Sequence, residues 1–305
     1  TDSPKIARLQ TAQQFYQSGQ FLAAIHTWKA AAEEYRAQGE RLHQSLVLSY
    51  LALAYQQVGQ FQPATEAMNE AMAFIAQQTV SQPTAKLIVA QFLNNQGEFQ
   101  LVQGQPETAL ETWKKAEKAY REISDRTGEI GTQLNQARAL QVLGFYLSAK
   151  TTLEGVQASL NDQPDSQLKI SGLLNLGNLL RIVGDFATAQ KVLEQSLAIA
   201  QKLQSTPDIQ IATFNLGNLA EARQQPEVAL EFYQQAAAAN SSVRLPAQIR
   251  QLDLLVESDR IVQAQALLPD IQIQLAKSPP SQATIYAEIA LAESLAKIGT
   301  WATGA

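Results

Sequence analysis

The chain has 305 residues, of which 46% are hydrophobic and 17% are charged, and its formal net charge is −5. This acidic balance lacks the basic face that nucleic-acid phosphates or an anionic membrane require, so we expect neither as a partner. The sequence contains no cysteine, which excludes disulfides, cysteine-ligated metals and cysteine nucleophiles. We expect no membrane insertion, because no apolar run approaches the ~18 residues of a membrane span. A chain without cysteine suits the cytoplasm, the periplasm or secretion after leader removal, so the compartment stays open.

A short turn pattern recurs along the chain with a period of about 40 residues. Gly19-Gln20-Phe21, Gly59-Gln60-Phe61 and Gly184-Asp185-Phe186 show the pattern most clearly. Aligned on this turn, the chain has eight turn positions, which are Gly19, Gly59, Gly104, Gly144, Gly184, Gln224, Asp259 and Gly299. So regular a spacing predicts an array of repeated structural units.

Small and large apolar residues keep fixed distances from these turns. The residue seven before the turn is small in six units, namely Ala12, Ala52, Gly97, Ala137, Gly177 and Gly217. The residue five after the turn is Ala24, Ala64, Ala109, Ala149, Ala189, Ala229 or Ala264, and a larger residue stands nine after it, namely Trp28, Met68, Trp113, Leu153, Leu193, Tyr233 or Leu268. Two antiparallel helices approach closely only where side chains are small, and bulky residues then fill the space beside the crossing. Each unit is therefore predicted to be a helical hairpin.

The predicted fold is all-α, a right-handed superhelical solenoid of about seven helix–turn–helix repeats plus one extra C-terminal helix. We expect a single array over residues 1–305. In chain order its units are 5–40, 41–80, 84–125, 127–163, 165–205, 207–241 and 245–278, followed by a helix at 281–298. Proline with Ser, Thr or Asp between the units favours the start of a new helix.

Residues for catalysis are few. The two histidines, His26 and His43, lie in different predicted units, and neither a phosphate-binding glycine loop nor a His-Glu-x-x-His motif is present. Adjacent acids such as Glu33 and Glu34 are typical of a solvated helix face. The sequence thus predicts a protein that is not an enzyme and has no cofactor or metal.

Four asparagines occupy one repeat position, nine residues before the turn. They are Asn95, Asn135, Asn175 and Asn215. In stacked hairpins this position would place them in a row with a spacing of about 9–10 Å. An amide both donates and accepts hydrogen bonds, so such a row could pair with a peptide backbone without reading its sequence. The same amides could instead bond a neighbouring helix and hold the hairpins in register.

Further polar residues follow at helical spacing on the predicted inner face. Arg138, Asn178 and Asn218 stand one turn beyond the asparagines, and Arg181 follows Asn178 by another turn. We therefore predict a peptide-binding groove with an amide floor and two arginines that offer positive charge.

The stretch Leu174-Asn175-Leu176-Gly177-Asn178, with Gly184-Asp185-Phe186 and Ala189 after it, resembles the tetratricopeptide repeat family. The resemblance extends from about Ile6 to Trp301. The period of about 40 residues is similar to the long-helix variant of kinesin light chains and Leu-Gly-Asn-repeat polarity adaptors. The glutamine-rich composition also resembles bacterial, notably cyanobacterial, arrays that precede a caspase-like CHAT domain. In this family an asparagine ladder grips the main chain of bound peptides, which implies that role for the four asparagines.

The sequence thus favours a non-catalytic module that binds a protein or peptide partner in the concave groove of the solenoid. Two alternatives stay open. The first is a regulatory module of a larger enzyme, a caspase-like CHAT protease, whose catalytic domain would lie beyond residue 305. The second is a scaffold that self-associates through its C-terminal end, because the helix at 281–298 lacks a following partner. We expect the natural protein to continue past this helix.

Overall fold

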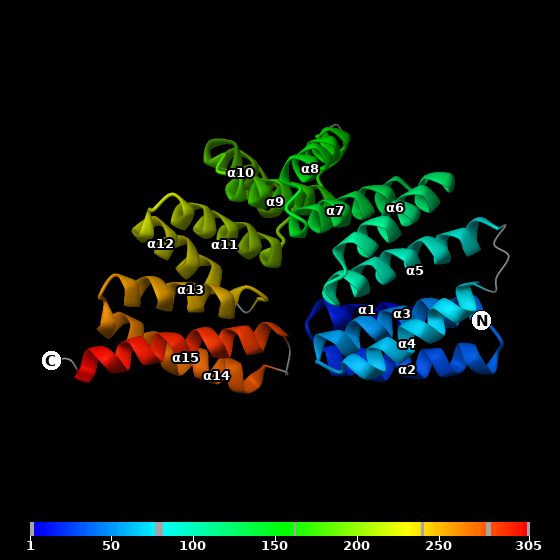
Figure 1. Cartoon of the computed structure of the whole chain (residues 1–305), viewed down its shortest axis with the longest axis horizontal. Coiled ribbons are helices and arrows are strands. Elements are labelled where there is room, and N and C mark those ends of the chain that lie inside the picture. Colours follow the sequence, from blue (N-terminus) through cyan, green and yellow to red (C-terminus); the bar gives the residue numbers. More distant parts are fainter. Residues whose placement is uncertain (1–2, 77–81, 162, 239–240, 279–281, 304–305) are drawn as a thin grey trace. The chain divides into compact units, whose positions relative to one another are not determined.

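The computed structural model describes residues 3–76, 82–161, 163–238, 241–278 and 282–303, and these residues form fifteen α-helices (Figure 1). Residue 80, where the second predicted unit ends, and residue 281, where the predicted last helix begins, lie outside the described residues. The helices of the first half are α1 (Ser3–Gln17), α2 (Phe21–Ala37), α3 (Arg41–Gln57), α4 (Phe61–Ala76), α5 (Pro83–Val102), α6 (Pro106–Glu122), α7 (Arg126–Val142) and α8 (Tyr146–Asn161). Those of the second half are α9 (Gln167–Ile182), α10 (Phe186–Lys202), α11 (Thr206–Ala222), α12 (Pro226–Ala237), α13 (Arg244–Glu257), α14 (Ile261–Lys277) and α15 (Gln282–Thr303). The all-α fold of seven helical pairs and one further helix is therefore confirmed.

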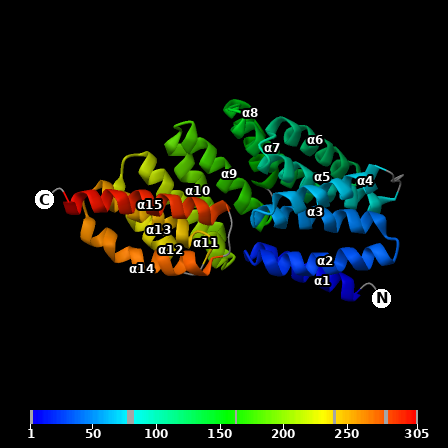
Figure 2. The same ribbon diagram turned by 60° about the horizontal axis from the view of Figure 1, so that its bottom comes forward.

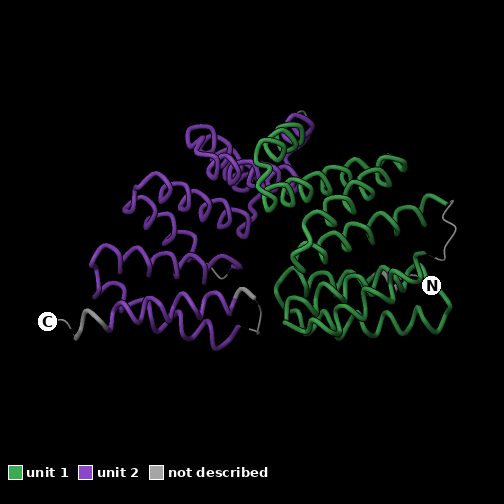
Figure 3. The backbone as a smooth tube through the Cα atoms, in the orientation of Figure 1, with its two compact units in different colours: residues 1–156 green, residues 157–305 purple. Residues whose placement is uncertain are grey.

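The chain divides into two compact units, residues 1–156 and residues 157–305, with the boundary inside α8 (Figure 3). In unit 1 the first helices of neighbouring hairpins contact one another, α3 with α5 and α5 with α7. In unit 2, α9 contacts α11 in the same way, and α15 packs against both α13 and α14 (Figure 2). The single continuous array and its right-handed superhelix stay predictions.

Left-handed backbone conformations mark the turns inside the hairpins. Gly19, Gly59, Gly104, Gly144 and Gly184 have φ between 72° and 84°, in the region that glycine adopts without a steric penalty. Gln224 and Asp259 take the same conformation with φ of 59° and 58°, although they carry side chains. The turns predicted at these seven positions are confirmed.

The eighth turn, predicted at Gly299, is wrong, because α15 continues through this residue to Thr303. An isolated glycine costs a helix only about 1 kcal/mol relative to alanine. Ile298 beside it is 8% exposed and belongs to the core that α13, α14 and α15 share. This packing keeps the backbone helical where the local signal alone favours a turn.

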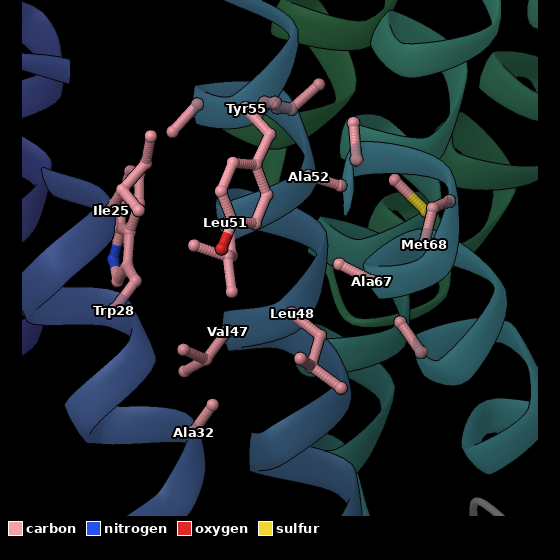
Figure 4. Close-up of a cluster of buried hydrophobic side chains, with 14 of the residues drawn as sticks. Ile25, Trp28, Ala32, Val47, Leu48, Leu51, Ala52, Tyr55, Ala67 and Met68 are labelled. Carbon is pink, nitrogen blue, oxygen red and sulfur yellow. The ribbon is translucent and has the colours of Figure 1, made fainter. Parts of the chain in front are cut away.

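The core of unit 1 follows the predicted alternation of small and large residues. Trp28 of α2 and Met68 of α4 are each 1% exposed, and Leu51 and Ala52 of α3 lie between those two helices (Figure 4). In the third and sixth hairpins the small residue is a glycine that lies directly against an aromatic ring. A Cβ on Gly97 would lie 2.5 Å from Nε1 of Trp113, and a Cβ on Gly217 in unit 2 would lie 2.7 Å from Cε1 of Tyr233. These close contacts fix the distance between the two helices of a hairpin.

Candidate functional site

In unit 1 the first helices surround a cavity of about 290 Å³, here called the aromatic cavity. Tyr16 comes from α1, Tyr50 and Leu53 from α3, and Asn95 from α5, and the other lining residues are Gln13, Trp28, Asn94 and Glu98. The rings of Trp28 and Tyr50 stack with centroids 5.4 Å apart, so one wall of the cavity is aromatic. The opposite wall on α5 is polar.

The asparagines of unit 1 take part in hydrogen bonds between helices. Asn95 is 6% exposed, and its Nδ2 donates to Oγ of Ser49 on α3 at 2.9 Å. Nδ2 of Asn135 donates across from α7 to Oδ1 of Asn94 on α5, also at 2.9 Å. Asn135 is half-buried, and its Oδ1 accepts from Arg138 at 3.3 Å. These bonds join consecutive hairpins, as expected for residues that set the register.

The charge of Arg138 is compensated inside unit 1. Its guanidinium donates to both carboxylate oxygens of Glu98, with N···O distances of 2.8 and 3.1 Å. Burial, followed by the negative charge of Glu98, raises the pKa of Tyr16 to about 12. Arg138 is therefore part of an ion pair on this face and does not offer an unpaired charge.

The asparagines of unit 2 bond to their own helices. Asn175 donates to the backbone carbonyl of Ser171 at 2.8 Å, and Asn215 donates to that of Ile211 at 3.0 Å. Asn215 is 7% exposed, whereas Asn175 and Asn178 are half-buried. A side-chain amide nitrogen carries two hydrogens, so these bonds leave one donor on each residue.

A second cavity, of about 270 Å³, opens between the first helices of unit 2, and we call it the arginine cavity. It is lined by Arg181 of α9, by Asn218, Glu221 and Ala222 of α11, and by Arg250 of α13. The sequence analysis predicted Arg181 and Asn218 as binding residues, and the structure brings these two together.

A network of hydrogen bonds holds the walls of the arginine cavity. The hydroxyl of Tyr233 lies 2.7 Å from Oε2 of Glu221 and 2.8 Å from Oδ1 of Asn218. Arg250 forms an ion pair with the other oxygen of Glu221. Burial, and after it the hydrogen bond with Glu221, raises the pKa of Tyr233, so the phenol stays a neutral donor. The side chains of α11, α12 and α13 are thus positioned before any ligand enters.

The two cavities are built from the same three repeat positions. Each cavity combines the residue three before the turn of one hairpin, the residue six before the turn of the next hairpin, and the residue nine before the turn of the third. In unit 1 these residues are Tyr16, Leu53 and Asn95, and in unit 2 they are Arg181, Asn218 and Arg250. Residues three apart on a helix share a face, so each first helix presents all three positions on one side. The helices contribute to the cavities obliquely rather than in a straight row.

Sequence reasoning missed Tyr50, Arg250 and Asn94. Tyr50 and Arg250 stand nine residues before the turns at Gly59 and Asp259, the position of the asparagines, so extending that column to all hairpins would have found them. No repeat signal marks Asn94, which only the three-dimensional packing brings to Asn135.

The part of the chain that the structure covers contains no group of three or more His, Cys, Asp or Glu side chains that could hold a metal ion. Within the same residues, no helix combines the length and the hydrophobicity that crossing a bilayer demands.

The sequence of residues 168–242 matches the tetratricopeptide repeat family. This segment comprises most of α9 and all of α10, α11 and α12, including Asn175, Arg181 and Asn215. This segment is therefore similar in sequence to tetratricopeptide repeats. The remaining hairpins have the same helical pairing and the same turns, so the whole fold is of the tetratricopeptide repeat type. No curated protein is a significant match to this sequence.

Solved structures of several proteins share the fold at low sequence identity. A Rap protein in complex with competence and sporulation factor superposes with a TM-score of 0.65 at 13% identity, covering 96% of this chain and 80% of that one. NprR in complex with its cognate peptide NprX gives 0.59 at 14% identity, covering 89% and 82%. A kinesin light chain protein of Podosopora anserina with nearly identical repeats gives 0.52 at 20% identity, covering 66% and 100%. The expected likeness to kinesin light chains is thus confirmed for the fold, and the likeness to arrays that precede a CHAT domain stays a prediction.

Proposed function

We propose that this chain is a non-catalytic module that binds a peptide or an extended segment of a partner protein along the first helices of its hairpins. The observation that carries the proposal is the pair of cavities described above. Each is lined mainly by the first helices of one unit, and residues three, six and nine before the turn contribute to both. Two proteins of similar fold, the Rap protein and NprR, are seen in complex with competence and sporulation factor and with the peptide NprX.

The chemistry of these faces suits an extended chain. Half-buried amides at Asn135, Asn175 and Asn178 retain donors and acceptors that can pair with a peptide backbone. In unit 1 the rings of Tyr16 and Tyr50 line the aromatic cavity and offer apolar contact to a ligand. Asn95 and Asn215 are buried, and we assign to them the role of holding their helices, which was the alternative reading of the asparagine row.

A displayed library of random twelve-residue peptides, selected on the full chain, tests the proposal. Peptides that are enriched should lose affinity when Asn135 and Asn175 are both replaced by Ala, by about fivefold for each neutral hydrogen bond removed. The matched control replaces Asn69 and Gln195, which are exposed on the second helices α4 and α10, and should leave affinity within twofold. Circular dichroism should show unchanged helix content in both variants. The proposal fails if no peptide is enriched, or if the control pair weakens binding as much as the asparagine pair.

Self-association is a second candidate, favoured by one observation on α15. Ile285, Tyr286 and Ile289 of this helix are 55%, 63% and 51% exposed. A second copy packed on this face would remove apolar surface from water. Light scattering over a hundredfold concentration range, repeated with Tyr286→Lys, tests it. A monomer mass at all concentrations contradicts it.

A further inference from the structure

The aromatic cavity of unit 1 combines three aromatic rings with one carboxylate. The rings belong to Tyr16, Trp28 and Tyr50, and among the described residues that line the cavity Glu98 is the only charged one. The centroid of the Trp28 ring lies 5.6 Å from that of Tyr16 and 5.4 Å from that of Tyr50. An aromatic ring attracts a cation that lies within about 6 Å of its centroid. Because the rings are this close together, a cation in the cavity can interact with more than one of them.

The electrostatic field at the aromatic wall is negative. Glu98 is paired with Arg138, but of these two charged groups only the carboxylate lines the cavity. Burial is the main cause that raises the pKa of Tyr16, and the negative charge of Glu98 comes next and outweighs the opposite effect of Arg138. The rings add to this field, because the face of an aromatic ring carries a partial negative charge. The cavity therefore favours a positive charge, although the ion pair as a whole is neutral.

We infer that the aromatic cavity binds an alkylammonium group, either that of a lysine side chain or that of a free quaternary ammonium compound. Such a site goes beyond the proposed function, because it accepts a small molecule as well as a group on a peptide. The volume of about 290 Å³ is at the lower end of the range for ligand sites, so the cavity suits an ammonium head group rather than a large molecule.

Oxygen atoms on the polar wall can accept hydrogen bonds from an ammonium ion that carries protons. Oδ1 of Asn94 accepts from Nδ2 of Asn135 at 2.9 Å, and an amide oxygen has two lone pairs, so a second acceptor position is left. Each oxygen of Glu98 accepts one hydrogen bond from Arg138, which also leaves lone pairs on the carboxylate. A primary ammonium group thus has acceptors on α5 and rings on α1, α2 and α3, whereas a quaternary one uses the rings and the charge.

Other classes of ligand suit this cavity less well. The carboxylate of Glu98 and the ring faces repel an anion. A neutral apolar group would remove water from the carboxylate without replacing its hydrogen bonds, which costs free energy. In unit 2 the described residues that line the arginine cavity include Arg181 and Arg250 but no aromatic ring, so that cavity repels a cation. We therefore assign the ammonium site to unit 1.

Small probes test the site in the full chain labelled with ¹⁵N-tryptophan, at constant ionic strength. The chain has three tryptophans, and the indole N–H resonance of Trp28 is identified by its loss in Trp28→Phe, or by elimination with Trp113→Phe and Trp301→Phe. Choline, a quaternary ammonium compound, or Nα-acetyl-lysine methylamide, which has a lysine side chain, should shift this resonance saturably. The more effective probe tells which source of ammonium the site accepts. The neutral isostere of choline, in which carbon replaces the nitrogen, should leave the resonance in place.

The ammonium site is refuted if neither charged probe moves the Trp28 resonance. It is also refuted if the neutral isostere moves the resonance as strongly as choline does, because the cavity would then bind by apolar contact alone. Neither result depends on the library selection. A failed selection with a responsive Trp28 would therefore contradict peptide binding and leave the ammonium site standing.

A pair of variants at Tyr50 measures the contribution of a ring. Tyr50→Leu removes the ring and keeps an apolar side chain, so it should weaken binding of the more effective probe about fivefold. Tyr50→Phe keeps the ring and should leave the affinity within twofold. Equal losses in the two variants would show that the ring face does not hold the cation, and would overturn the inference.

A pair of double variants measures the contribution of the charge. Removing Glu98 alone would leave Arg138 unpaired, so Glu98→Gln is combined with Arg138→Gln, which keeps the net charge of the protein. Binding should weaken about fivefold, because the carboxylate is at the cavity wall and the guanidinium is not. The matched control replaces Arg36 and Glu70, an ion pair between α2 and α4 with an N···O distance of 2.9 Å, with Gln and should leave the affinity within twofold. Equal affinities in the two double variants, with unchanged helix content by circular dichroism, would overturn the inference.

Discussion

The contact between Gly97 and Trp113 leads to a quantitative prediction about hairpin packing. Replacing Gly97 with Ala puts a Cβ 2.5 Å from Nε1 and 2.6 Å from Cε2 of a tryptophan that is 0% exposed. The ring cannot turn away freely, because its Nε1–H donates to the carbonyl of Asn94 at 3.0 Å. Either the indole or the whole helix α6 must move.

The expected cost follows from three opposing effects. Overpacking a close-packed core costs about 1–3 kcal/mol. Weakening the indole hydrogen bond adds up to ~1 kcal/mol. The better helix propensity of alanine offsets ~1 kcal/mol of this loss in stability. We therefore expect the free energy of unfolding of unit 1 to fall by about 2 kcal/mol, which lowers its melting temperature by about 4–8 °C.

Urea unfolding followed by tryptophan fluorescence measures this loss. The matched control is Gly131→Ala in the interior of α7, where the new Cβ would have no neighbour within 4 Å. This substitution should raise stability by ~0.5–1 kcal/mol, since only the helix propensity changes. The steric argument is refuted if Gly97→Ala is as stable as Gly131→Ala.

A compensating substitution tests the same contact from the other side. In the fourth hairpin, Ala137 and Leu153 occupy the equivalent positions, and both are 0% exposed. Combining Gly97→Ala with Trp113→Leu should give a protein about 1–2 kcal/mol more stable than the sum of the two single changes predicts. Simple additivity would show that the two side chains do not compete for the same space.

Three further predictions concern polar groups. Asn95→Ala leaves the buried hydroxyl of Ser49 without its donor and should lower the stability of unit 1 by about 1–3 kcal/mol in urea unfolding. Tyr16 has a folded-state pKa of about 12. The stability that it contributes is therefore complete below pH 10 and is lost as the pH rises toward 12. Unfolding curves of Tyr16→Phe should show a smaller loss of stability over this alkaline range than those of the parent protein. The hydrogen bond from Gln248 is the first cause that lowers the pKa of Asp270 below 3.8, so its contribution is present above that pH and is lost as the pH falls through the folded-state value. Asp270→Asn should therefore be less stable than the parent at pH 7, and the difference should vanish in acid.

The repeat pattern predicted the fold because each hairpin solves the same packing problem. Turn positions, small residues and large residues all recur with one period, so an atypical residue in one unit does not hide the pattern that the seven units share. Even Gln224 and Asp259, which lack the usual glycine, adopt the left-handed conformation there. At Gly299 the pattern fails because Ile298, which precedes the glycine, is packed against other helices.

The binding face was predicted less completely, for a different reason. Periodicity places Asn175 and Asn215 at equivalent positions, but it does not determine whether an amide points across the groove or bonds the carbonyl one turn earlier on its own helix. Likewise it does not show that Arg138 is held by Glu98, whereas Arg181 forms no ion pair with any residue that the structure describes. Side-chain rotamers and pairing depend on neighbours from other hairpins, which the sequence order does not reveal.

The oblique meeting of three repeat positions has a consequence for how such a protein can change its specificity. Because the aromatic cavity and the arginine cavity each draw side chains from three consecutive hairpins, one hairpin can contribute to as many as three adjoining cavities of this kind. Inserting or deleting a whole hairpin would then create new combinations of lining side chains in the cavities on both sides of that hairpin, while each helical pair keeps its own core. Shuffling of intact hairpins, more than point substitution, is the economical route by which an array of this kind acquires a different ligand.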